Sequence, residues 1–549
     1  MAPSVSRFSA LLNRLCVPVI PAALVALLAN AESAMARSRY GSPEAAEDFA
    51  WARIKEGKAA DFKDLCDSPA LDPRANDEDS ENKWHDDCRQ LSARFLVNVI
   101  TKKRLGDQVS FAGVRIIGAR IVGDFDIQNA KLERAIFIAG SRIENVKLES
   151  VQTNSDFELI RSRVSGIFVA KQFHGELSLN LRGTEFQREV NLENAKVDVN
   201  LDMDDTVFDR EVKADQMQVG SSFLMNNAKF KKELILPKVR VNGQVAAAKA
   251  EFGGRLDAQS LQVGTSAYMP SIASESEVNL VFASIGTNLD LRNAKLAHLN
   301  LSGATISGDL RLAVQSYRNL VWCTRGRGTR GLYLRNTRIG NLMDAEDVWP
   351  EKGDLHLDGF ALSRFGGFGE NEDSGAFKRG VKWWDDWARR DPNYSPSPYQ
   401  QLAAAFAASG HVEMADQLRY ARYEREQENL GFMAWIWSWP LKWIAGFGIY
   451  PHRVLYWIAV ISLGGAAYLW AYSKGVRDAG HGVIWCFGAS LSKLLPVIDI
   501  NKEFKDFFDD PTREKLTEFQ TFVFSLIGLL GWFLAAILVA AVSGITGKS

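Results

Sequence analysis

A short apolar pattern recurs every eleven residues through the middle of the chain, and it constrains the fold more than any other feature. Each unit has two apolar residues separated by one residue, then a small residue and a further apolar one. A fixed short period is typical of solenoids, in which each unit buries its apolar residues against its neighbours. The most regular units begin at Val190, Leu201, Val212, Phe223, Leu234, Val245, Leu256, Ala267, Val278 and Leu289.

The length of the repeat predicts the size of a coil. Eleven residues are too few to enclose a filled interior, so we expect two units, about 22 residues, in each coil. With a rise of about 4.8 Å per coil, about nine or ten coils would form a rod of roughly 45 Å. An antiparallel meander is the alternative, but it would need an Asn-Gly or Asp-Gly turn at every second unit, which the sequence does not supply. The fold class predicted is therefore mainly β: a β-solenoid over residues 108–363, with a helical cap over 37–107 and a helix–turn–helix neck over 374–430.

The first 36 residues have the composition of a secretory signal peptide. Arg7 and Arg14 precede an apolar run from Cys16 to Leu28, and Ala34 and Ala36 are the small residues that signal peptidase requires. An uncleaved anchor is the alternative. Export would place the body of the chain in an oxidising compartment.

Two cysteines flank a polar, acidic stretch in the predicted cap. In an oxidising compartment, a disulfide between Cys66 and Cys88 would close this loop. Two free thiols are the alternative for a cytoplasmic chain. The acidic residues between them lack the glycine and the spacing of a calcium-binding loop, so we expect a solvated loop.

Two stretches near the C-terminus, 454–472 and 519–546, contain no charged residue and are each long enough to cross a membrane. Pro440 and Pro451 interrupt the segment that leads to the first stretch, which favours an interfacial helix over a third span. We therefore predict a membrane domain over 431–549. Tryptophans suited to a membrane interface precede the first span, at Trp435, Trp437, Trp439 and Trp443.

Between these stretches, residues 481–500 are apolar but contain Lys493, Pro496 and Asp499. The order of span, short segment and span is similar to that of two-span potassium channels, in which the middle helix points at a filter of backbone carbonyls. The filter sequence of those channels is absent, since Leu494-Leu-Pro-Val-Ile-Asp499 stands in its place. An interfacial helix beneath the spans is the preferred interpretation, and a pore is the alternative.

The repeats resemble those of pentapeptide-repeat proteins, as in Leu289-Asp-Leu-Arg-Asn-Ala-Lys-Leu296. This resemblance implies a right-handed, four-sided β-helix. The chain from about Ala93 onward is also similar to a bacterial family often labelled membrane-associated oxidoreductase, and that label implies a redox activity. The residues that carry this second resemblance are Gly113–Ile121, Trp349-Pro350, Leu357–Phe360, Pro398–Leu402 and Leu494–Asp499.

The residues themselves do not support a redox site. Gly326, Gly328 and Gly331 match a dinucleotide fingerprint, but the repeat resumes after them, where the fingerprint requires a helix. The seven histidines form no zinc motif, and no Cys-x-x-Cys pair is present. A cluster of aspartates is expected to be a solvated solenoid edge rather than an acid–base pair; it consists of Asp202, Asp204 and Asp205. We therefore predict no catalytic residue, cofactor or metal.

The charge balance of 65 basic and 66 acidic residues argues against nucleic acid as a partner. We expect a non-enzymatic protein anchored in the inner membrane of a bacterium, with its solenoid in the periplasm. The solenoid would offer a binding or scaffolding surface to another envelope protein or to a polymer. Two alternatives stay open: an oligomeric two-span channel with a regulatory solenoid, and the oxidoreductase that the family label implies.

Overall fold

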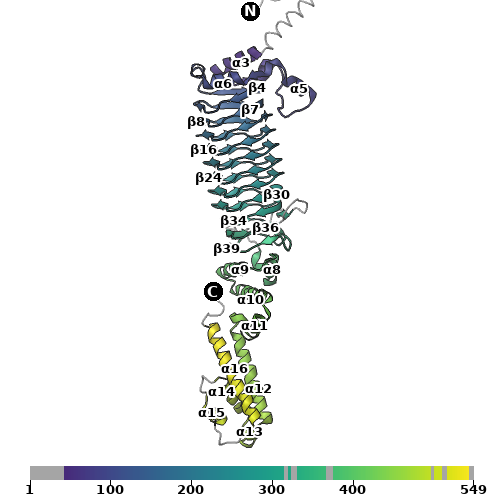
Figure 1. The fold of residues 1–549 in the computed structure, drawn as a ribbon, viewed down its shortest axis with the longest axis vertical. Coiled ribbons are helices and arrows are strands. Elements are labelled where there is room, and N and C mark those ends of the chain that lie inside the picture. The colour runs from purple at the N-terminus through teal and green to yellow at the C-terminus, as the bar shows by residue number, and fades with distance from the viewer. Residues whose placement is uncertain are drawn as a thin grey trace, which may run out of the picture. The chain divides into compact units, whose positions relative to one another are not determined.

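The computed structural model describes residues 43–313, 320–322, 331–366, 375–495, 500–509 and 516–542. The chain divides into two compact units. The first extends to Pro350, and the second comprises Glu351–Phe365 and the chain from Gly375 onward. The predicted signal peptide lies outside the described residues. The first unit contains the stacked strands, and the second consists mainly of helices (Figure 1).

The first unit contains a parallel β-solenoid of about 11 turns with about 22 residues in each coil. The predicted coil size is therefore confirmed, although there are somewhat more coils than the expected nine or ten. Strands align with strands one coil later, so that Leu179 lies opposite Leu201 and Phe186 lies opposite Phe208. Each coil contributes four short strands, for example β12 (His174–Gly175), β13 (Leu179–Asn180), β14 (Glu185–Phe186) and β15 (Val190–Asn191). The first two belong to one parallel sheet and the last two to a second.

The corners of the solenoid account for the small residue in the repeat. Ala195 donates its backbone N–H to the carbonyl oxygen of Leu192 at 3.0 Å, which closes a tight turn. Asn194, between them, has a φ of 56°. Left-handed backbone costs about 1–2 kcal/mol for most residues other than glycine. The stacked hydrogen bonds compensate this cost, because the same conformation recurs every eleven residues at Gln172, Gly183, Asn194, Asp205, Gln216, Asn227, Lys238, Lys249, Ser260, Ser271, Phe282 and Asn293.

The interior of the solenoid is filled by ladders of identical or similar side chains. Four phenylalanine rings stack with centroid separations of 5.2, 4.8 and 5.4 Å: Phe186, Phe208, Phe230 and Phe252. A second ladder is polar. The hydroxyl of Ser141 accepts the N–H of Ala119 at 3.1 Å, and that of Ser162 accepts the N–H of Ser141 at the same distance. These buried hydroxyls are therefore satisfied within the stack, as buried polar groups require.

The N-terminal segment, predicted to be helical, also contains two strands. β1 (Ala60–Asp61) pairs with β3 (Val114–Ile117), and β2 (Gln90–Ser92) pairs with β4 (Arg120–Asp126). They extend the sheets beyond the first regular coil, where unpaired strand edges would otherwise be exposed. The helices of this cap include α3 (Pro43–Lys55), α6 (Ala93–Thr101) and α7 (Lys103–Gly106).

The second unit begins with two strands, β38 (Leu355–His356) and β39 (Ala361–Phe365), and continues with a helical neck. The neck consists of α8 (Val381–Ala388), α9 (Ser397–Ala408) and α10 (Val412–Glu428). The next helix, α11 (Phe432–Ala445), continues through Pro440, so the expectation that this proline breaks the segment is wrong. Contacts with α10 hold α11 on both sides of the proline: Gln427 donates to Ser438 at 2.7 Å, and Lys442 pairs with Glu424 at 2.8 Å.

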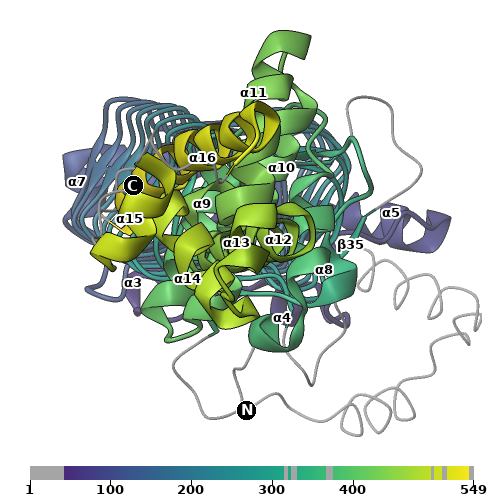
Figure 2. The same cartoon turned by 90° about the horizontal axis from the view of Figure 1, so that it is seen from below.

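Two helices of this unit, α12 (His452–Tyr472) and α16 (Glu518–Val542), are long and apolar enough to cross a membrane, as predicted. At 1.5 Å per residue they are about 31 and 37 Å long. Between them in the chain lie α13 (Lys474–Asp478), α14 (Val483–Leu494) and α15 (Lys502–Asp509). Figures 1 and 2 show these helices in light green and yellow. One apolar cluster joins them, with Leu469, Cys486 and Phe524 among its buried members.

Candidate functional site

A disulfide closes a loop beside the solenoid. Cys66 and Cys88 are joined with an S–S distance of 2.06 Å and a Cα–Cα distance of 5.6 Å, which is the pairing expected from the sequence. The loop contains α5 (Glu78–Trp84), which lies beside the first coils in Figure 1. We call residues 67–87 the arm.

The acidic side chains of the arm are exposed to solvent, as expected, except for the half-buried Glu81. The arm is nevertheless bound to successive coils, which the sequence did not predict. Arg142 donates to the carboxylate of Glu81 at 2.8 Å, and its guanidinium lies 5.0 Å from the ring centre of Trp84. One coil further, Arg163 donates to the side chain of Asn76 at 2.7 Å. In the coil after that, Arg74 of the arm donates to a backbone carbonyl of the solenoid. The arm therefore ties the N-terminal coils together.

The aspartate cluster is part of a hydrogen-bonded ladder. Asp204 is buried, which corrects the expectation of a solvated edge for this residue. Its carboxylate accepts from Arg182 of the preceding coil at 2.9 Å, and from the backbone and side-chain N–H groups of Asn226 in the next coil at 2.6 and 3.0 Å. Burial raises the pKa of Asp202, whose carboxylate accepts the backbone N–H of Asp204. Asp205 pairs with Asn227 of the next coil at 3.0 Å. These side chains connect coils, and the arrangement is structural.

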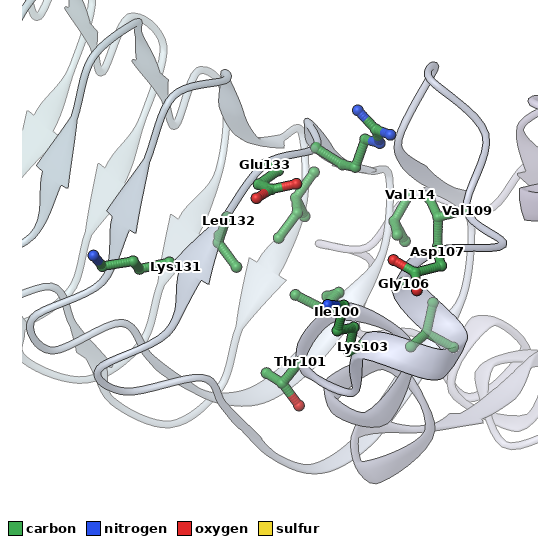
Figure 3. A pocket seen from close by; sticks show the side chains of 13 residues that line it. Ile100, Thr101, Lys103, Gly106, Asp107, Val109, Val114, Lys131, Leu132 and Glu133 are labelled. Carbon is green, nitrogen blue, oxygen red and sulfur yellow. The ribbon is translucent and has the colours of Figure 1, made fainter.

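A cleft of about 380 Å³ lies between the cap helices and the first coils (Figure 3). Lys103 and Asp107 line it from the side of α7, and Lys131, Glu133 and Arg134 line it from the solenoid. Charges of both signs alternate around aliphatic walls. Among the described residues, no group of three or more histidine, cysteine or acidic side chains is placed to hold a metal ion. The charged side chains of the cleft can form ion pairs and hydrogen bonds with a small polar ligand. The lining contains no nucleophilic side chain hydrogen-bonded to a base.

The glycine fingerprint is followed by a strand. Gly331 begins β36 (Gly331–Tyr333), which aligns with β33 (Lys295–Asn300), with Leu332 opposite Leu299. A dinucleotide site would require a helix N-terminus at this point. The return of the repeat after Gly331 is confirmed; Gly326 and Gly328 lie outside the described residues.

The short helix α14 runs into the bundle between α12 and α16 and does not lie beneath them. Gly465 is in the middle part of α12, and a Cβ there would collide with the hydroxyl of Ser490 in α14. Gly531 is in the middle of α16, and a Cβ there would collide with the carbonyl of Leu494 at the end of α14. Small residues thus let the helices approach closely. The preferred interpretation of an interfacial helix beneath the spans is therefore wrong.

The segment that contains α14 returns to the side of the bundle where it entered. The side chain of Gln520 donates to the carbonyl of Tyr472 at 3.1 Å, so the end of α12 lies beside the start of α16. α15 packs back on α14, where Trp485 donates to Glu503 at 3.1 Å. We call α14 and α15 the re-entrant hairpin. Of the three residues singled out between the spans, Lys493 lies in the last turn of α14, with its ammonium 5.4 Å from the ring centre of Phe508. The other two, Pro496 and Asp499, lie outside the described residues.

Three of the tryptophans before the first span, Trp435, Trp439 and Trp443, line an apolar groove of about 1240 Å³. Its walls come from α11, α12 and α16, and every lining side chain is apolar or aromatic. Trp457 of α12 donates its indole N–H to the carbonyl of Trp443 in α11 at 3.2 Å, which fixes one wall. The principal lining residues are Trp435, Trp439, Trp443, Trp457, Ile461, Leu530, Phe533 and Ile537. The sequence indicated the tryptophans but not that α16 faces them.

No family model, curated protein or solved structure matches this chain. The features that bear on its function are therefore the solenoid surface, the arm, the re-entrant hairpin and the groove.

Proposed function

We propose that this chain is a membrane-anchored, non-enzymatic protein whose solenoid acts as a binding or scaffolding surface in the bacterial envelope. The observation that carries the proposal is the pairing of a regular solenoid with a second unit that contains two helices fit to span a membrane. The solenoid interior is filled by stacked side chains, so its outer faces are what it offers to a partner.

The location proposed is the inner membrane, with the solenoid in the periplasm. The disulfide between Cys66 and Cys88 supports an oxidising compartment, since such bonds are rare in the cytoplasm. The sequence features of a signal peptide agree with export. In this orientation α12 runs from the periplasm to the cytoplasm, and the re-entrant hairpin enters the membrane from the cytoplasmic side.

The described surface of the solenoid is largely polar and periodic, but some aromatic side chains on it are exposed. Oppositely charged residues one coil apart pair along it, as in Lys229 with Glu251 at 3.2 Å. Tyr268 and Phe282 are two of these aromatic side chains, with 43% and 62% of their surface exposed. Tyr268 lies in β29 (Ala267–Tyr268), and Phe282 precedes β31 (Ser284–Ile285), a strand of the same sheet. Exposed aromatic residues on an otherwise polar surface favour protein or polymer contact.

A photoreactive phenylalanine analogue placed at Tyr268 or Phe282 tests this function in intact cells. We expect one reproducible crosslinked species from these positions and none from the analogue at Lys229, an exposed control on the other sheet. Equal, diffuse crosslinking at all three positions would contradict a defined binding face. Purified chain that retains a flavin, haem or nicotinamide would instead support the oxidoreductase.

A second candidate function is an oligomeric channel, and the re-entrant hairpin is the observation that favours it. A short helix that enters a bundle between two spans is the arrangement that orients pore segments in two-span channels. Conductance of the full-length protein in planar bilayers tests this function. A conductance that changes in Lys493→Gln and Asp499→Asn would support the channel. If the protein shows no conductance, the scaffold function is favoured.

A further inference from the structure

We propose that the groove between α11, α12 and α16 binds an anionic phospholipid, with its acyl chains in the groove and its phosphate at Arg453. This inference rests on the membrane location in the proposed function. It concerns a different surface from the solenoid, and it assigns a lipid ligand to the second unit.

The groove has the chemistry of a hydrocarbon site. No charged side chain is among its lining residues, and its volume of about 1240 Å³ exceeds the roughly 300–1,000 Å³ of most small-molecule pockets. It is also open along its length, since Trp439, Leu530 and Phe533 have 48%, 41% and 49% of their surface exposed. A flexible acyl chain fits a long open groove of this kind and would cover the exposed aromatic surface.

The groove is formed before a ligand enters it. The polar contacts of α11 with α10, through Ser438 and Lys442, fix the face of α11 that adjoins its tryptophans. This orientation directs Trp435, Trp439 and Trp443 toward the groove, where their rings follow one another at centroid separations of 6.0 and 5.9 Å. A preformed site loses less free energy in ordering its side chains when a ligand binds.

A cation lies one helical turn before the groove residue Trp457 in α12. Arg453, Trp457 and Ile461 follow one another at intervals of four residues, so they lie on the same face of α12. The Arg453 guanidinium is held 4.9 Å from the ring centre of Tyr450 and 5.6 Å from that of Tyr420. A guanidinium matches the oxygens of a phosphate. Lys442, by contrast, is already paired with Glu424. The charge therefore favours an anionic headgroup at the start of α12.

A second copy of the chain fits this groove less well than a lipid. Helices pack closely in membranes where small residues bring their backbones together. The groove contains no glycine, alanine, serine or threonine among its lining residues, and α11 contributes bulky indole rings. Such a surface is shaped for a thin, flexible chain.

Native mass spectrometry of the full-length chain, purified in mild detergent with phosphatidylglycerol added, tests the site. We expect the wild type to retain phosphatidylglycerol. Leu530→Trp narrows the groove and should bind this lipid about tenfold more weakly, which corresponds to a loss of about 1.4 kcal/mol of binding free energy. Leu463→Trp is the matched control, because Leu463 is 59% exposed on α12 and does not line the groove. Arg453→Gln is expected to abolish the preference for phosphatidylglycerol over phosphatidylcholine.

Equal lipid retention by Leu530→Trp and Leu463→Trp would overturn the assignment. So would crosslinked dimers formed through cysteines placed at Ile436 and Leu530, because a second copy would then fill the groove. Flotation with phosphatidylglycerol vesicles separates this proposal from the proposed function. A chain that floats but retains no lipid refutes the site alone, and a chain that does not float refutes the membrane location as well.

Discussion

Removal of the disulfide in Cys66→Ala/Cys88→Ala is expected to destabilise the N-terminal coils of the solenoid selectively. The bond joins residues separated by 22 positions. In the chain-entropy treatment, a loop of this length contributes about 3 kcal/mol at 25 °C. The stability of a repeat protein is approximately a sum over neighbouring coils, so the loss should concentrate where the arm is bound.

Hydrogen–deuterium exchange followed by mass spectrometry of peptides measures this effect. We expect protection to fall by up to about 100-fold in the coils that contain Arg142 and Arg163, since each 1.4 kcal/mol is a factor of ten. Coils around Phe252, which the arm does not contact, should exchange as in the wild type. Treatment of the wild type with a reductant should reproduce the change, and the double variant should be insensitive to it. An equal loss of protection along the whole solenoid, or no loss at Arg142, would refute the reasoning.

Three further experiments test contacts within the two units. Phe208→Ala removes one of the two inner rings of the four-ring ladder and should lower the free energy of unfolding, measured by thermal or denaturant unfolding, by about 3–5 kcal/mol. Phe282→Ala, at an exposed ring, should lower it by less than about 0.5 kcal/mol. Gly531→Leu should displace α14 and increase the reactivity of buried Cys486 toward a thiol reagent in a Cys323→Ser background; Gly464→Leu, at a glycine with open space around its Cα, should not. The hydrogen bond from Arg142 lowers the pKa of Glu81 below its ordinary value of 4.5. The ionised carboxylate therefore stabilises the arm fully above about pH 4.5, and this stabilisation is lost as the pH falls through the pKa of Glu81 in the folded chain. Glu81→Gln should remove that pH dependence from the exchange of arm amides, corrected for intrinsic rates, and an unchanged profile would contradict the pairing.

The repeat by itself determined the solenoid. The two apolar residues of each unit must be buried against other apolar residues. Stacking each unit on the unit two positions later provides that contact, so the coil of about 22 residues follows from the spacing of the repeat. The candidate spans also follow from local composition, because a long stretch without charge needs no knowledge of its neighbours. The pairing of Cys66 with Cys88 needed only their position on either side of a polar loop.

The tertiary structure decided the features that depend on distant contacts. Asn194, Lys249 and Phe282 adopt the same left-handed conformation although their side chains differ, because the stacked coils impose it and no single residue type signals it. The acidic residues of the arm are exposed, as the sequence predicted, but its attachment to the solenoid depends on arginines one coil apart that the fold brings beside it.

The same is true of the helical unit. The sequence of α14 does not indicate that this helix enters the bundle. Its position between α12 and α16 depends on the close approach allowed by Gly465 and Gly531, which belong to those two helices. The groove likewise exists only where α16 meets the tryptophans of α11, almost 100 residues earlier in the chain. Local composition specifies which segments become helices and strands, whereas the surfaces that could bind a ligand arise from the way those segments pack.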